Sequence, residues 1–323
     1  MLGLYFAAKN NPMNVYLAPM EGLADAYLRE ILSKASGYDL ITSEFVRVVD
    51  QLLPIRTYLT QVPELLNQSN TRNGTPVRVQ LLGNHPEMMG LNAQRATELG
   101  SHGIDLNFGC PSKTVNRSKG GAVMLTDPQS IFNTVAAVRA ALPPEQPLSA
   151  KMRLGYEDNS LMMECAHAIE DAGAQAITIH ARTKVQGYTP PAYWHLVKHI
   201  SDKLKIDKTI NGDIWTLSDA QQAIKDSGCD HIMIGRGAIK NPKLADSIKQ
   251  NQDSTAQWST TAPLVQEFWN NITADMSTRY CAGRLKQWLI FLKDLYPEAE
   301  ALFIAVRKLT EISDIQPFID ELI

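Results

Sequence analysis

Several features that narrow the function of a chain are missing from this sequence of 323 residues. No apolar run approaches the roughly 20 residues that a membrane helix needs. The mildly apolar start, MLGLYFAAKNNPM, lacks a convincing cleavage site for a signal peptide. The four cysteines, Cys110, Cys165, Cys229 and Cys281, lie far apart and form no CxxC pair. The sequence therefore predicts no metal site and no membrane segment, and it favours a reducing, cytoplasmic setting.

An excess of positive charge is also missing, because 31 Lys and Arg stand against 34 Asp and Glu, for a net charge of −3. Any binding of nucleic acid must therefore depend on a local cationic patch. Hydrophobic residues make up 44% and charged residues 20% of the chain, as in ordinary soluble proteins. The length suits one large domain with a smaller one beside it.

Eight short, β-branched runs alternate with amphipathic stretches along most of the chain. The predicted strands cover 15–18, 40–43, 77–82, 103–107, 148–153, 176–180, 208–211 and 231–235. Residues typical of helix ends lie between the strands. Asp127 followed by Pro128 is typical of a helix start, and Gly228 of a helix end. This alternation predicts an α/β fold, a (β/α)₈ TIM barrel, with an open, doubly wound sheet as the alternative.

The composition changes near the end of the last strand–helix unit. The polar stretch NQDSTAQWSTT predicts a linker, and apolar stripes at helical spacing follow it. We expect an N-terminal extension (1–13), a barrel (14–250), a linker (251–261) and a small C-terminal helical-bundle domain (262–323). Nothing in the sequence requires more than a monomer.

Unusual residues recur at the ends of the predicted strands, which meet at one face of a barrel. APMEG follows the first strand, Gln80 lies in the third, Lys151 in the fifth and His180 at the end of the sixth. Because lysine is almost never buried without a partner, Lys151 is expected to face an anionic or carbonyl partner in the barrel mouth, unless it is exposed to water. His180 and Gln80 can equally be structural residues that bond to their neighbours.

Glycine loops follow the predicted seventh and eighth strands, as NGD (211–213) and GRG (235–237). Glycine lets backbone N–H groups approach an anion, and these two loops form the recurrent phosphate site of such barrels. Arg236 would add a charge-assisted hydrogen bond. The alternative is that both loops are tight turns with no ligand.

Cys110 lies in LNFGCPSKTVNRSKGGA, directly after the fourth strand. With an ordinary pKa of about 8.5 its thiol is protonated at neutral pH, so it can act as a general acid rather than as a thiolate nucleophile. The alternative is that it packs as a small hydrophobic residue.

These motifs together resemble the tRNA-dihydrouridine synthases. The matching stretches, in order from 18 to 238, are APMEG, VQLLG, LNFGCPSKTV, GGA, KMRLG, HARTKVQGY, NGDIW and MIGRGA. EFVRVVDQLLP and GRLKQWL further resemble the bacterial C subgroup, which acts on uridine 16 of tRNA. The resemblance implies FMN across the barrel mouth, with NADPH or NADH as reductant. Hydride would pass from flavin N5 to C6 of the uracil, and Cys110 would protonate C5.

The resemblance also assigns individual residues. The implied FMN contacts are Pro19, Met20, Glu21, Gln80, Lys151, His180, Asn211, Gly212, Asp213, Gly235 and Arg236. The implied tRNA contacts are Arg47, Asn107, Tyr188, Arg284, Lys286 and Arg307, and the RNA surface is expected to include Lys113, Arg117 and Lys119 near the acid. From residue 255 onward six Lys and Arg stand against nine Asp and Glu, so the RNA surface is expected to be local and to span both domains.

Three other functions fit parts of the pattern. A flavin barrel acting on free pyrimidines, similar to dihydroorotate dehydrogenases, would share the lysine and the phosphate loops. A barrel that binds RNA without catalysis would not need Cys110. A sugar-phosphate isomerase or aldolase would use Lys151 as a Schiff-base former.

Overall fold

The computed structural model describes residues 13–253 and 256–322. Apart from Met13, the predicted N-terminal extension (1–13) lies outside the described residues. Among the helices of the described ranges, none has the length and apolar character to cross a membrane.

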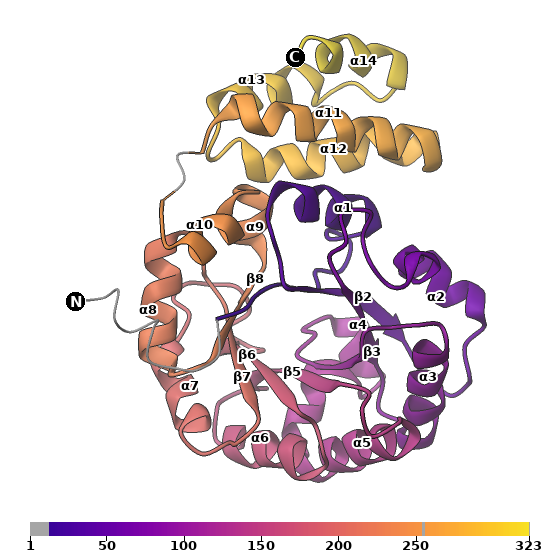
Figure 1. Cartoon of the computed structure of the whole chain (residues 1–323), viewed down its shortest axis with the longest axis vertical. Helices are drawn as coiled ribbons and strands as arrows, with labels where there is room; N and C mark the ends of the chain where they lie inside the picture. The colour runs from indigo at the N-terminus through magenta and orange to yellow at the C-terminus, as the bar shows by residue number, and fades with distance from the viewer. Residues whose placement is uncertain (1–12, 254–255, 323) are drawn as a thin grey trace.

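Eight parallel strands of the described chain close into a barrel in sequence order, with β1 paired to both β2 and β8 (Figure 1). They are β1 (Val15–Leu17), β2 (Leu40–Arg47), β3 (Val77–Leu82), β4 (Ile104–Phe108), β5 (Leu148–Gly155), β6 (Ala176–Thr183), β7 (Asp207–Asn211) and β8 (His231–Ile234). The predicted TIM barrel is confirmed, and the open-sheet alternative is wrong.

Helices surround the barrel, between successive strands and after β8. They are α1 (Ala26–Ala35), α2 (Ile55–Gln61), α3 (Pro86–Glu98), α4 (Lys113–Arg117), α5 (Pro128–Ala141), α6 (Met162–Asp171), α7 (Trp194–Ser201), α8 (Leu217–Ser227), α9 (Arg236–Lys240) and α10 (Leu244–Gln250), with short 3₁₀ turns at Pro63–Asn67 and Gly121–Thr126. The predicted signals set their ends: Asp127 accepts a hydrogen bond from the Ser130 N–H at the start of α5, and Gly228 ends α8 in the left-handed conformation.

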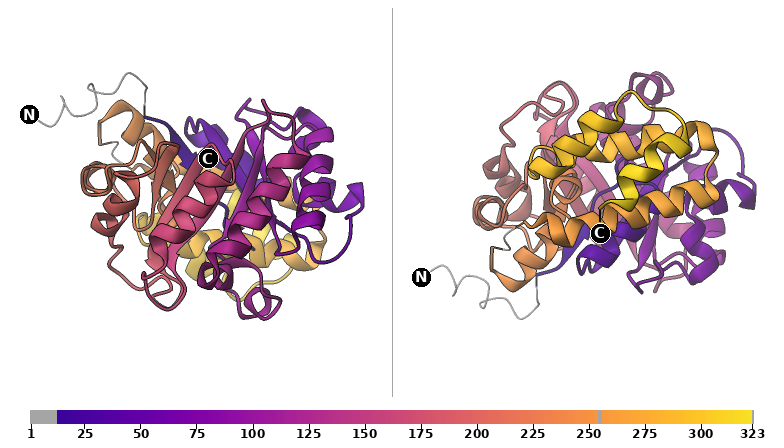
Figure 2. Two further views of the ribbon diagram at one scale, coloured as in Figure 1. Left: turned by 90° about the horizontal axis from the view of Figure 1, so that it is seen from below. Right: turned by 90° about the horizontal axis from the view of Figure 1, so that it is seen from above.

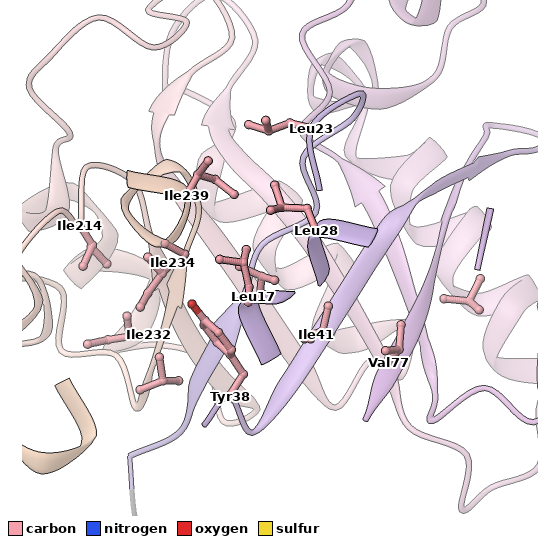
Figure 3. Close-up of a cluster of buried hydrophobic side chains, with 14 of the residues drawn as sticks. Leu17, Leu23, Leu28, Tyr38, Ile41, Val77, Ile214, Ile232, Ile234 and Ile239 are labelled. Carbon is pink, nitrogen blue, oxygen red and sulfur yellow. The ribbon is translucent and has the colours of Figure 1, made fainter. Parts of the chain in front are cut away.

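The main core lies between the strands and the surrounding helices. Figure 3 shows part of it, where Leu17 of β1 and Ile41 of β2 lie beside Leu28 of α1 and Ile232 of β8. All four side chains have no exposed surface. Burying each contributes about 1.5–3 kcal/mol, so apolar packing fixes the strands whose ends carry the site.

Four further helices pack on one side of the barrel, over α1 and α9 (Figures 1 and 2). They are α11 (Trp258–Asp275), α12 (Thr278–Leu292), α13 (Pro297–Val306) and α14 (Ile312–Asp320). Trp288 of α12 is buried and donates to the Ile239 carbonyl of α9 at 3.0 Å, which joins the two parts. The predicted linker (251–261) is too long, because α11 already begins at Trp258.

Candidate active site

Two adjoining cavities, of about 730 and 80 Å³, open at the carboxyl ends of the strands. They share Pro19, Met20, Lys151, His180, Tyr188 and Arg236, so they form one continuous site. Of the other predicted residues, Glu21, Arg47, Asn107 and Cys110 line the larger cavity, and Asn211, Gly212, Asp213 and Gly235 line the smaller one. Gln80, Arg284, Lys286 and Arg307 line neither.

The smaller cavity is built from the glycine loops after β7 and β8. Gly212 has φ +117°, and a Cβ there would lie 3.0 Å from Cδ2 of His180, so the position requires glycine. Asp213 is held in an ion pair by the buried Arg182, and Nη2 of Arg236 lies 3.7 Å from its Oδ1. Arg182 Nη1 and Asp213 Oδ1 are buried without a hydrogen-bond partner. Asp213 lines the cavity, so its unpaired oxygen can accept a hydrogen bond from a polar ligand group, whereas Arg182 lines neither cavity.

Lys151 joins the two cavities. Its side chain is 9% exposed, and its Nζ donates to Oδ1 of Asn211 at 3.0 Å. Burial, followed by the charge of Arg153, lowers the pKa of Lys151 to about 7. The lysine faces the cavity as predicted, and the alternative of a water-exposed lysine is wrong. A bound anion would favour its charged form.

His180 also faces both cavities. Its Nε2 is buried and without a partner. Burial, and then the cations Arg153 and Lys151, hold the pKa of His180 well below its usual range. The imidazole is therefore neutral at neutral pH and can offer one hydrogen bond to a ligand.

Arg153 is a site residue that the sequence reasoning missed. It is 2% exposed, and its Nε donates to the Gly109 carbonyl at 2.8 Å, while its Nη1 reaches the Thr183 and Gly187 carbonyls at 3.1 and 2.9 Å. Its guanidinium lies 5.2 Å from the centre of the Tyr188 ring. It therefore ties the Cys110 loop to the loop after β6.

The signal that could have found it is period-2 spacing. Arg153 follows Lys151 by two residues on β5, and Arg182 follows His180 by two on β6. Because residues two apart share a face of a strand, each arginine points the same way as a residue already singled out.

A buried network runs from the middle of the barrel to the Cys110 loop. The strand register places Gln80, Asp105 and Ser149 side by side. Asp105 accepts from Gln80 Nε2 and from Ser149 Oγ, both at 2.6 Å. Gln80 Oε1 in turn accepts from Asn107 Nδ2 at 2.7 Å. Gln80 therefore lies behind the lining and holds Asn107.

Asn107 completes this network at the cavity. Its Oδ1 accepts the backbone N–H groups of Gly109 and Cys110, both at 2.9 Å. One Nδ2 hydrogen is left to donate toward the cavity. Burial raises the pKa of the half-buried Cys110 thiol. The thiol is thus protonated at neutral pH and can give a proton to a bound molecule.

The predicted RNA-contacting cations lie in different places. Arg47 is at the cavity rim, where its Nη2 donates to Ser118 Oγ at 2.5 Å. Lys113, Arg117 and Lys119 are exposed beside it, and Arg307 is exposed on the helical domain. Lys286 donates to the Leu309 carbonyl, and Arg284 is bonded to the barrel, as described below.

The fold and the site define a TIM-barrel enzyme with a cationic, glycine-lined recess and a protonated thiol facing a wider cavity. Solved structures of the same fold include a 2-naphthoyl-CoA reductase complex (TM-score 0.58, 12% identity, 75% of this chain and 51% of that one). A morphinone reductase mutant in complex with tetrahydroNAD is also similar (TM-score 0.51, 12% identity, 77% and 89%).

Sequence comparison identifies the family. Residues 16–305 match the family described as dihydrouridine synthase. The chain is similar to proteins named tRNA-dihydrouridine(16) synthase from Shewanella oneidensis (51% identity, 91% of this chain and 93% of the relative) and Haemophilus influenzae (44%, 96% and 100%). The chain belongs to the dihydrouridine synthase family and is an enzyme of that family. The resemblance seen in the sequence is confirmed, and the match decides against the three alternative functions.

Proposed function

We propose that this chain reduces the C5=C6 bond of a tRNA uridine, at position 16, to 5,6-dihydrouridine, with FMN as cofactor and NADPH as reductant. The observation that carries the proposal is the position of Cys110, which lines a cavity of about 730 Å³ that continues into a glycine-lined recess with Arg236 at its edge.

The residues of this cavity fit FMN. Gly212, Asp213 and Gly235 would hold its phosphate through backbone N–H groups, and Arg236 through its guanidinium. Asn211, Lys151 and His180 would meet the polar edge of the ring system, and Pro19, Met20 and Glu21 would form one wall. When bound and reduced by NADPH, the flavin would supply the hydride, from N5 to C6 of the uracil.

The protein's own groups would orient the uracil and supply the proton. The free N–H of Asn107 is a donor for a uracil carbonyl, because the other polar groups of this amide are already bonded. Arg153 and Tyr188 line the same cavity. Cys110 would give its proton to C5, and its raised pKa keeps that proton in place until hydride arrives.

The RNA must deliver an extruded base, at a cost of a few kcal/mol. Rim cations would offset this cost through phosphate contacts: Arg47, Lys113, Arg117 and Lys119, with Lys286 and Arg307 on the helical domain. The name shared by the relatives supports position 16, and tRNA is the partner.

The test begins with the visible spectrum of the purified protein. The protein is then incubated with NADPH and unmodified tRNA, and dihydrouridine is mapped by mass spectrometry. We expect a flavin spectrum and product at position 16. Cys110→Ala should keep the flavin and lose most product, whereas Cys165→Ala, a buried cysteine outside the cavity, should keep both. Product at another uridine would refute the position, and a full rate from Cys110→Ala would remove Cys110 from the mechanism.

A further inference from the structure

The turn between β1 and α1 forms a wall of the cavity through Pro19, Met20 and Glu21. It is a tight turn, since the Leu23 and Ala24 N–H groups both donate to the Met20 carbonyl, at 3.0 and 2.9 Å. Its remaining polar backbone groups need partners from elsewhere in the fold.

Two of those partners come from the barrel itself. The Gly22 N–H donates to Glu44 of β2 at 2.5 Å, and the Ala24 carbonyl accepts from the fully buried Arg29 of α1 at 2.8 Å. The carbonyls of Gly22 and Leu23, which lie between these two groups in the chain, accept hydrogen bonds from outside the barrel.

These two carbonyls are bonded by α12 of the helical domain. Gln287 Nε2 donates to Gly22 O at 2.8 Å, and Arg284 Nη2 donates to Leu23 O at 3.1 Å. Arg284 also forms an ion pair with Asp25, the N-cap of α1: its Nε and Nη2 lie 2.9 and 2.8 Å from Asp25 Oδ2.

All five N–H groups of Arg284 are directed at partners within the protein. Besides Leu23 and Asp25, Nη1 points to Gly22 O at 3.5 Å and bonds Gln287 Oε1. The side chain is 14% exposed. Arginine has five donors, so none is left for a phosphate in this arrangement. Arg307, by contrast, is exposed.

We infer that Arg284 is a positioning residue of the cofactor cavity: from the helical domain it fixes the turn that carries Pro19, Met20 and Glu21. The inference rests on the proposed FMN site and differs from the RNA contact that the resemblance assigns to Arg284. The helical domain would then be part of the cofactor site as well as a surface for RNA.

The test compares FMN dissociation constants, from flavin fluorescence, in full-length variants without RNA. Arg284→Gln should weaken FMN roughly tenfold, equal to about 1.4 kcal/mol. Arg284→Lys should weaken it nearly as much, because lysine keeps the charge but lacks the planar fork. Asp25→Asn should resemble both and add little to Arg284→Gln, while its Oδ1 still caps α1.

Lys308→Gln, which removes an exposed cation of the same helical domain, is the matched control and should leave FMN affinity unchanged. Unchanged FMN affinity in Arg284→Gln and Arg284→Lys, with weaker tRNA binding, would overturn the inference. A second measurement needs no flavin: amide hydrogen exchange at Leu23 and Ala24 should accelerate in Arg284→Lys and not in Lys308→Gln. Equal exchange in the two variants would also overturn it. If the wild-type protein binds no FMN, the proposed function itself is refuted.

Discussion

Replacing Lys151 by methionine should stabilise the flavin-free protein near neutral pH. The folded protein holds the Lys151 ammonium in a buried position, with a pKa of about 7. An unfolded chain gives lysine a pKa of about 10.4. The unfolded state therefore binds this proton more tightly. Lys151 lowers the free energy of unfolding at every pH at which it is protonated in the unfolded chain.

The size of the effect follows from the shift. Between about pH 7 and 10 the unfolded state carries one proton more than the folded state, so stability rises with pH by up to about 1.4 kcal/mol per unit. At about pH 7 the accumulated cost is about 4 kcal/mol, and at about pH 9.5 it has fallen to about 1 kcal/mol. Methionine removes this cost but also removes the bond to Asn211, a loss of about 1–3 kcal/mol.

Lys151→Met should thus exceed the wild type by about 1–3 kcal/mol at about pH 7 and lose that advantage at about pH 9.5. Urea unfolding of the flavin-free proteins, followed by tryptophan fluorescence at several pH values, measures this. Lys113→Met, an exposed lysine on the cavity rim, controls for the loss of one charge. Parallel pH profiles for wild type and Lys151→Met would refute the reasoning. FMN should bind Lys151→Met more weakly, a trade of function against stability.

Three further predictions concern the same cavity. Because burial raises the pKa of Cys110, the rate of its alkylation by iodoacetamide should rise with a midpoint above the ordinary value of about 8.5; a midpoint below that value would contradict the assignment. Gly212→Ala should lower stability by about 1–3 kcal/mol in urea unfolding, because of its positive φ and the close approach to His180; unchanged stability would contradict the strain. Asp105→Ala removes the acceptor of Gln80 and should speed the alkylation of Cys110 by loosening its loop; an unchanged rate would contradict the network.

Much of the barrel was predictable because its strands are short β-branched runs buried on both faces. Val77–Leu82 was predicted with the observed bounds, and the other strands start within one residue of their prediction. The ends of β2, β5 and β6 were missed. β2 continues through Glu44 to Arg47 and β6 through Arg182 to Thr183, and these polar residues resemble the start of a loop. β5 runs two residues past its predicted end at Arg153, to Gly155.

The site was predictable where a single unusual residue marks the end of a strand: Cys110 and Lys151 were both expected at the barrel mouth, and both line the larger cavity. It was not predictable where function depends on contacts between distant segments. Arg284 lies on an amphipathic helix whose sequence indicates only a cation beside an apolar stripe. Its attachment to Gly22, Leu23 and Asp25 depends on how α12 packs on the barrel, which no local pattern encodes.

The buried network from Asp105 to Cys110 has a direction. Both carboxyl oxygens of Asp105 accept hydrogen bonds, from Gln80 Nε2 and from Ser149 Oγ. This arrangement fixes which end of the Gln80 amide faces Asp105, and Gln80 then fixes the amide of Asn107. Residues in such a hydrogen-bond network cannot be substituted independently. If a donor replaces an acceptor, each following side-chain amide must rotate to exchange its oxygen and nitrogen. Substitutions at Asp105, Gln80 and Asn107 should therefore be strongly non-additive, so redesign of the base pocket has to alter them together.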